Sequence, residues 1–131
     1  MPLDVLIVDD STAIRKILQR VLVQADIQIS SVHEAADGLE ALNVLRTKSV
    51  NLVFSDVNMP NMDGLAFIRR VREKDKDTPI IMVTTEAEKS RIIEAIKSGV
   101  NNYVIKPFTP DSLLERVTQT MAKRQAAVAA A

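Results

Sequence analysis

The chain has 131 residues, of which 47% are hydrophobic and 26% charged, a length and composition that suit one compact domain. Lys plus Arg and Asp plus Glu each number 17, so the total charge gives no reason to expect a nucleic acid or an anionic membrane as a partner. The lack of cysteine excludes disulfide scaffolds and thiolate chemistry, and no apolar run approaches the roughly 18 residues of a membrane span, so we expect a cytoplasmic protein.

Short apolar runs rich in β-branched residues recur along the chain and predict five strands. These runs are Val5–Val8, Ile29–Val32, Leu52–Phe54, Ile80–Val83 and Tyr103–Ile105. Four of the five are continuously apolar, which is typical of strands buried on both faces of a parallel sheet.

Segments with apolar residues at three and four spacing follow the runs and predict five helices. They are Thr12–Gln24, Gly38–Arg46, Gly64–Glu73, Glu88–Ser98 and Asp111–Lys123. Ser11 is placed to cap the first helix, Gly99 to end the fourth, and Pro110 to begin the fifth. We expect one domain over residues 1–123 and a frayed, alanine-rich extension of the last helix over 124–131.

Alternating strands and helices predict a doubly wound α/β domain, in which ligands bind beyond the carboxyl ends of the strands. The polar residues that directly follow four of the apolar runs are Asp9, Asp10, Ser55, Asp56, Thr84, Thr85 and Lys106. Three carboxylates, hydroxyl groups and one ammonium should therefore converge at one edge of the sheet.

Three aspartates held together at neutral pH call for a cation. Mg²⁺ prefers oxygen ligands and keeps coordination positions open for a phosphate oxygen. A lysine ammonium and a threonine hydroxyl beside it can hold phosphoryl oxygens. This combination predicts phosphoryl transfer, a reaction in which the protein mainly positions groups and neutralises charge.

Five short motifs in order resemble the receiver domain of bacterial two-component response regulators, most closely the single-domain regulators of chemotaxis. They are Val8–Ser11, Ser55–Pro60, Met62–Gly64, Val83–Glu86 and Val104–Phe108. Each is weak alone, but all occur in sequence, each after its strand or just before the next helix. The resemblance spans Asp4 to Ala122 and implies a flavodoxin-like three-layer sandwich, a (βα)5 fold with a parallel sheet of order 2-1-3-4-5.

The resemblance also implies a role for each acidic residue. Asp56 stands at the position of the phosphoacceptor, which takes a phosphoryl group from a histidine kinase. Asp9, Asp10, Asp56 and the backbone carbonyl of Asn58 are implied as Mg²⁺ ligands. Asn58 also occupies a position that modulates phosphorylation lifetime in the family.

On the hydroxyl and lysine side, the resemblance implies that Lys106 and Thr84 bind the phosphoryl oxygens. Thr84 and Tyr103 match the pair that moves on phosphorylation. Thr85 and Glu86 are modulators, and Thr85 departs from the small residue common in the family, so that its branched side chain could narrow the approach to Asp56.

A structural reading competes with the functional one at several positions. Asp9 could cap the first helix, and Asp63 is better explained as a turn residue before the third. Tyr103 could simply pack against the last strand. Pro107 resembles a family proline preceded by a cis peptide bond.

Two other classes of function remain open. A Mg²⁺-dependent phosphohydrolase also uses an aspartate nucleophile, but enzymes of the haloacid-dehalogenase kind carry it on the first strand with a second Asp two residues later, whereas adjacent Asp9 and Asp10 stand here. A nucleotide-binding module is disfavoured because the three glycines form no phosphate-binding motif.

The expected output is a change of surface. The 24 residues after Pro107 leave no room for an output domain within this chain. The resemblance implies that the surface of the fourth helix, fifth strand and fifth helix binds a target, for which the flagellar motor switch is the first candidate. A role in a phosphorelay or as a phosphate sink is the alternative, and a phosphatase is a further candidate partner. We expect no enzymatic activity beyond the protein's own phosphorylation and dephosphorylation.

Overall fold

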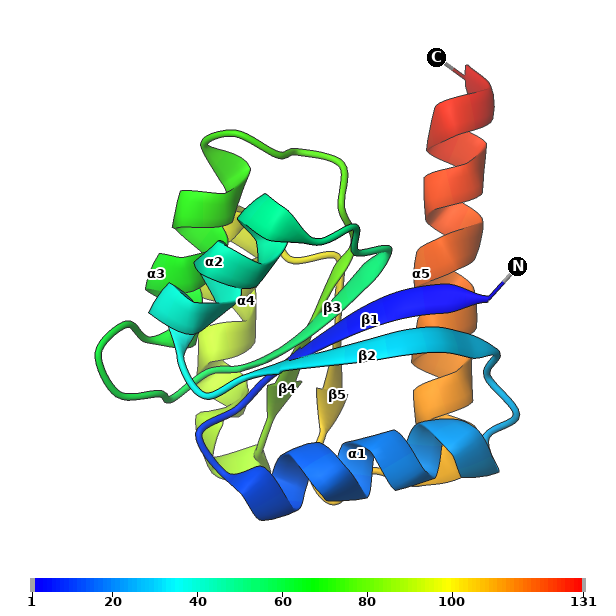
Figure 1. Ribbon diagram of the computed structural model, residues 1–131, viewed down its shortest axis with the longest axis horizontal. Coiled ribbons are helices and arrows are strands. Elements are labelled where there is room, and N and C mark those ends of the chain that lie inside the picture. The colour runs from blue at the N-terminus through cyan, green and yellow to red at the C-terminus, as the bar shows by residue number, and fades with distance from the viewer. Residues whose placement is uncertain (1, 131) are drawn as a thin grey trace.

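The structure, a computed structural model, describes residues 2–130 and contains one five-stranded parallel sheet (Figure 1). Its strands are β1 (Leu3–Val8), β2 (Ile29–Ala35), β3 (Leu52–Asp56), β4 (Ile80–Thr84) and β5 (Asn102–Ile105). They lie in the order β2-β1-β3-β4-β5, with every neighbouring pair parallel. The predicted strand order is confirmed, and β3 lies at the centre of the sheet.

Helices cover both faces of the sheet and complete the predicted three layers. They are α1 (Thr12–Gln24), α2 (Gly38–Thr47), α3 (Gly64–Arg72), α4 (Ile92–Ser98) and α5 (Pro110–Ala130). In Figure 1, α1 and α5 lie on one side of the sheet, and α2, α3 and α4 on the other.

Alternation along each strand divides the core into two apolar clusters. Phe54 belongs to the cluster under α1 and α5, whereas Val53 belongs to the cluster under α2, α3 and α4. Both side chains have 0% exposure. Because β3 is buried on both faces, its apolar residues fix the position of the strand end that carries Asp56.

Local signals end and begin the helices as predicted. The Ser11 hydroxyl accepts a hydrogen bond from the Ile14 amide at 3.2 Å and caps α1. Gly99 follows α4 with a φ of 116°, a conformation that glycine adopts without strain. Pro110 is the first residue of α5.

Most boundaries agree with the prediction within one or two residues, but the second strand and the fourth helix differ more. Strand β2 continues to Ala35, three residues beyond the predicted end, because polar residues such as His33 are tolerated on an edge strand. The predicted helix over Glu88–Ser98 is wrong in its first turns, where the chain forms a 3-10 helix, η1 (Glu86–Arg91), before α4 begins. Helix η1 contains no buried residue, so no packing against the core selects the α-helical form.

The C-terminal helix includes most of the alanine-rich segment. Helix α5 continues to Ala130, so the expected boundary at 123 falls within it, and the expected fraying of 124–131 stays a prediction. Residue 131 lies outside the described residues. Within the part of the chain that the structure describes, no helix combines the length and apolar character that a membrane span requires.

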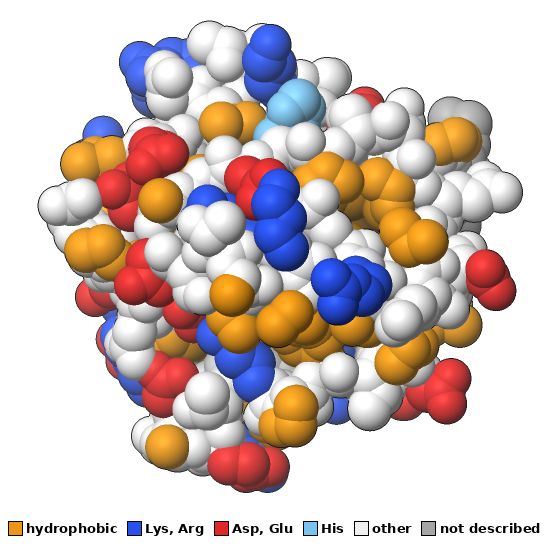
Figure 2. All heavy atoms as spheres, turned by 60° about the horizontal axis from the view of Figure 1, so that its bottom comes forward, with side chains coloured by type: hydrophobic (Ala, Val, Ile, Leu, Met, Phe, Trp, Pro, Cys, Tyr) orange, Lys and Arg blue, Asp and Glu red, His pale blue; other side chains and the backbone are white. Residues whose placement is uncertain are grey.

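The surface carries mixed charge on the face shown in Figure 2, where the lower side of Figure 1 is turned toward the viewer. Lys and Arg side chains are interspersed there with Asp and Glu side chains. This agrees with the equal numbers of basic and acidic residues in the sequence.

Candidate functional site

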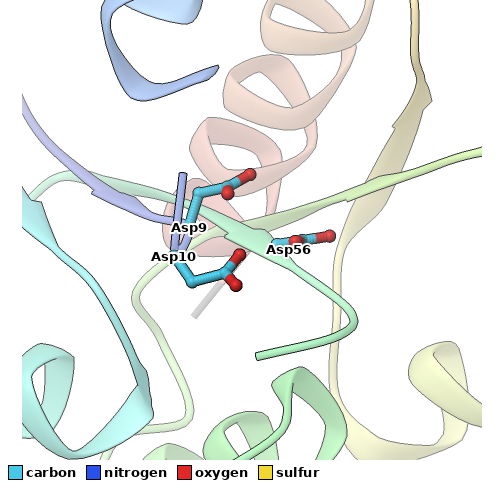
Figure 3. Close-up of side chains that lie close together, drawn as sticks. All are labelled: Asp9, Asp10 and Asp56. Carbon is cyan, nitrogen blue, oxygen red and sulfur yellow. The ribbon is translucent and has the colours of Figure 1, made fainter. Parts of the chain in front are cut away.

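Three carboxylates from two adjacent strands meet at the carboxyl edge of the sheet (Figure 3). Asp9 and Asp10 directly follow β1, and Asp56 is the last residue of β3. One carboxylate oxygen of each lies within 4.8 Å of those of the other two. Asp9 and Asp56 are buried and Asp10 is exposed, so the cluster opens to solvent on the side of Asp10. The sequence predicted this convergence.

Lys106 adds a positive charge to the cluster from the end of the edge strand β5. It directly follows β5, and its Nζ lies 3.4 Å from Asp9 Oδ2 and 3.6 Å from Asp56 Oδ1. The peptide bond between Lys106 and Pro107 is cis, as the resemblance implied. One ammonium contacts two of the three carboxylates, so the cluster keeps an excess of negative charge for a cation to neutralise.

The electrostatics of the cluster disfavour the charged form of Asp56. Burial raises the pKa of the Asp56 carboxyl from its ordinary 3.8 to about 6, and the Asp9 carboxylate acts in the same direction. The Lys106 ammonium and the Val57 amide, which donates to Asp56 Oδ1 at 2.8 Å, oppose this rise. A cation bound beside Asp56 would favour the ionised form, which is the nucleophilic one.

Asp9 has both a structural and an electrostatic partner. Its Oδ1 accepts a hydrogen bond from the Ser11 amide at 2.8 Å, while Oδ2 faces Lys106. The Arg15 guanidinium donates to the backbone carbonyl of Asp9. These contacts fix the Asp9 carboxylate at the start of α1, where its second oxygen points into the cluster.

The two hydroxyl residues after β4 differ in burial. Thr84 is fully buried, and its hydroxyl donates to the backbone carbonyl of Thr85 at 3.4 Å. Thr85 is half-buried, and its hydroxyl donates to Glu88 at 2.9 Å. In the ladder Asp56 pairs with Val83, so Thr84 is one position further along β4 than the partner of Asp56. Its contact with a phosphoryl group stays a prediction.

The two remaining predicted modulators lie at the rim. Asn58 is exposed, and its side-chain oxygen accepts a hydrogen bond from Arg91 at 2.9 Å. Glu86 is exposed at the start of η1, 4.0 Å from Lys89. Sequence reasoning did not find Arg91, because nothing in its local pattern indicates a contact with a loop 33 residues away.

Tyr103 lies on β5, apart from the carboxylates. Its ring is partly buried against the core, and the Arg116 guanidinium lies 4.5 Å from the ring centroid. This cation–π contact joins β5 to α5. The role of Tyr103 as a switch residue stays a prediction.

Gly64 is a site residue whose role the sequence did not reveal. A Cβ atom at this position would lie 2.1 Å from the Asp56 carbonyl oxygen. The Gly64 amide donates to the Val57 carbonyl at 2.7 Å, and Asp63 caps α3 by accepting from the Ala66 amide. The start of α3 thus packs directly on the backbone of Asp56, and the Asp-Gly pair before a helix is the only signal of it in the sequence.

The fold and the acidic cluster together are those of a phosphorylation switch, and comparison with known proteins gives the family. The response regulator receiver domain matches residues 5–118, so the chain belongs to this family. As a receiver domain of two-component signalling, it is a phosphorylation switch that takes its phosphoryl group from a histidine kinase and acts on a target protein.

Among curated relatives, the chain is similar to a chemotaxis protein CheY homolog of Campylobacter jejuni, at 43% identity over 88% of this chain and 90% of that protein. It is 40% identical to chemotaxis protein CheY-3 of Vibrio cholerae, over 86% of this chain and 87% of the relative.

Solved structures agree with the sequence relatives. The chemotaxis response regulator CheY4 of Vibrio cholerae superposes with a TM-score of 0.80 at 37% identity, over 92% of this chain and 99% of that one. A putative response regulator from Chloroflexus aurantiacus superposes with a TM-score of 0.84 at 35% identity, over 93% of this chain and 99% of that one.

Proposed function

We propose that Asp56 is the phosphoacceptor. A carboxylate oxygen of Asp56 attacks the phosphorus of a kinase phosphohistidine, an O–P bond forms as the N–P bond breaks, and the imidazole leaves with the electron pair. The observation that carries this proposal is the convergence of Asp9, Asp10 and Asp56 with Lys106 at the carboxyl edge of the sheet. Of the three carboxylates, Asp56 is the one on the central strand and beside Thr84.

The donor set fits Mg²⁺. Hard oxygen ligands from Asp9, Asp10 and Asp56 lie within 4.8 Å of one another, and the backbone carbonyl of Asn58 follows two residues after Asp56. When bound, the cation neutralises the carboxylates and the charge of the transferring group. The excess of carboxylates over Lys106 is what this role requires.

Lys106 and Thr84 hold the transferred group. The Lys106 ammonium already lies 3.6 Å from Asp56 Oδ1 and needs little movement to contact a phosphoryl oxygen there. The Thr84 hydroxyl, whose contact with the Thr85 carbonyl is long at 3.4 Å, turns toward the phosphoryl oxygen instead. The chain after Thr84 follows this movement.

The output is a changed surface of α4, β5 and α5 that binds the flagellar motor switch in the cytoplasm. The phosphoryl group carries a charge of about −1.5 to −2 in place of the carboxylate's single negative charge. The movement of Thr84 toward it then changes the positions of Tyr103 and α4. Similarity to chemotaxis regulators from two bacteria supports this target. A relay or sink for phosphate uses the same site without this target, and in either role the protein turns over no external substrate.

Incubation with Mg²⁺ and acetyl phosphate tests the acceptor. Intact mass should show a gain of one phosphoryl group, which Asp56→Asn and a chelator should each abolish. A phosphorylated Asp56→Asn protein would show that another residue is the acceptor.

Titration with the motor switch protein tests the target. Affinity should be higher for the phosphorylated protein than for the unmodified one. Equal affinity, in a protein that is phosphorylated, would favour the relay or sink.

A further inference from the structure

The segment between β4 and α4 is held by side-chain hydrogen bonds rather than by burial. Helix η1 runs over six residues, whereas 3-10 helices longer than three or four residues are uncommon because of their poorer hydrogen-bond geometry. None of its residues is buried. Packing against the core therefore does not explain its form.

Two side-chain hydrogen bonds lie at the ends of this segment. At its start, the Thr85 hydroxyl donates to Glu88 Oε1 at 2.9 Å. At its end, an Arg91 guanidinium nitrogen donates to Asn58 Oδ1 at 2.9 Å. We call this second contact the Arg91–Asn58 bridge. It joins the loop after β3, which directly follows Asp56, to the segment that follows β4.

Arg91 is also the residue at which the helix changes type. It is the last residue of η1 and directly precedes α4, with φ −83° and ψ −6°. The sequence around it favours an ordinary α-helix, as the periodicity over Glu88–Ser98 indicates. The bridge is thus a contact from outside the helix. It acts on Arg91, where the 3-10 helix η1 ends and the α-helix α4 begins.

Both ends of the bridge belong to segments that the proposed phosphorylation displaces. Asn58 must present its backbone carbonyl to the cation, and η1 follows Thr84, which turns toward the phosphoryl group. Helix α4, which begins directly after Arg91, exposes Ile93 and Ile96 at 68% and 54%. A change in η1 therefore changes how α4 presents these apolar side chains.

We propose that Arg91 is a positioning residue of the switch: the Arg91–Asn58 bridge holds η1 in its 3-10 form in the resting protein and opposes the arrangement that accepts a phosphoryl group. The inference rests on the proposed phosphorylation of Asp56. A contact made only in the resting state lowers the apparent affinity for anything that binds the other state. Breaking the bridge should therefore strengthen the binding of a phosphoryl analogue.

The first measurement is NMR of the resting protein. Asn58→Ala removes the acceptor and keeps the Arg91 charge, while Arg91→Met removes the donors and keeps most of the apolar stem. Both variants should move the Cα chemical shifts of Glu86–Arg91 toward α-helical values. Arg91→Lys keeps the charge and a donor and should resemble the wild type, as should Lys97→Met, which removes an exposed cation of the adjoining helix α4.

The second measurement is the affinity for beryllium fluoride at saturating Mg²⁺. Asn58→Ala and Arg91→Met should each bind it about three- to tenfold more tightly than the wild type, which is within the range expected for loss of one typical hydrogen bond. The double variant should equal either single variant, because both remove the same contact. Lys97→Met and Arg91→Lys should bind as the wild type does.

The outcomes separate this inference from the proposed function. Unchanged Cα shifts over Glu86–Arg91 in either single variant would overturn the inference, as would unchanged or weaker analogue binding by either one while the wild type binds. If the wild type itself binds no analogue, the proposed function fails, and the chemical shifts still decide whether the bridge holds η1.

Discussion

The two ends of strand β3 are both buried, but one end carries apolar side chains and the other a carboxyl group. Leu52, Val53 and Phe54 have 0% exposure and pack between the helical layers. Asp56, two positions beyond Phe54 on the same face of the sheet, has 7% exposure and carries a carboxyl whose pKa burial raises to about 6. Burial stabilises the fold at the first end and opposes ionisation at the second. Substitutions at the two ends should therefore change stability in opposite directions.

Truncation in the apolar part should have the largest effect. Phe54→Ala removes a fully buried ring and should lower the free energy of unfolding by about 3 to 5 kcal/mol. Chemical denaturation checks this. Leu114→Ala, at a site that is 42% exposed, is the control and should cost clearly less. Equal losses would mean that β3 does not fix the core.

Removal of the buried carboxylate should have the opposite sign. The folded state holds the Asp56 proton more tightly than the unfolded chain does. The contribution of this group to stability is therefore fully present below pH 3.8 and is lost as the pH rises through the folded-state pKa of about 6. Asp56→Asn should thus stabilise the metal-free protein at pH 7.5 by up to about 3 kcal/mol, the equivalent of that pKa difference.

The pH dependence is the check on this prediction. The stability difference between Asp56→Asn and wild type should shrink as the pH falls from 7 to 4, measured by denaturation without metal. Asp63→Asn, an exposed helix cap at which Asn also caps well, should stay within about 0.5 kcal/mol of wild type. A pH-independent difference would argue against a raised pKa.

A single added methyl group should test how tightly the start of α3 packs on the Asp56 end of β3. Gly64→Ala places a Cβ 2.1 Å from the Asp56 carbonyl and should destabilise by about 1 to 3 kcal/mol, with slower phosphorylation by acetyl phosphate. Gly38→Ala is the matched control, because the atoms nearest to its Cβ would belong to the flexible Met62 side chain and not to the backbone. Similar losses in both variants would remove the special role of Gly64.

Binding of Mg²⁺ should change the stability of the protein least. It should also reduce the difference between the two ends of β3, because it favours the ionised carboxylates at the Asp56 end. At tenfold its dissociation constant, the cation should stabilise the folded protein by about 1.4 kcal/mol. Asp10→Asn should reduce the rise in Tm, whereas Glu115→Gln on α5 should leave it unchanged. An equal rise in both variants would place the cation elsewhere.

The parts of the molecule set by local pattern were predictable, and the parts set by long-range contacts were not. Continuous apolar runs gave the strands, and because strand ends share one edge, the meeting of Asp9, Asp10 and Asp56 followed from the sequence. The 3-10 form of η1 did not follow, since it depends on Arg91 reaching Asn58 across the site. Nor did the role of Gly64, because its contact with Asp56 exists only after α3 has packed.

The central place of β3 determines how far Asp56 lies from the edge of the sheet. Asp56 pairs with Val83 on β4, and β4 pairs directly with β5. A displacement at the middle strand thus crosses only one neighbour before it reaches the outermost strand on that side. β3 and β5 are therefore two strand spacings apart, about 10 Å. If Asp56 is the phosphoacceptor, as proposed, its modification acts within this distance of the β5 edge.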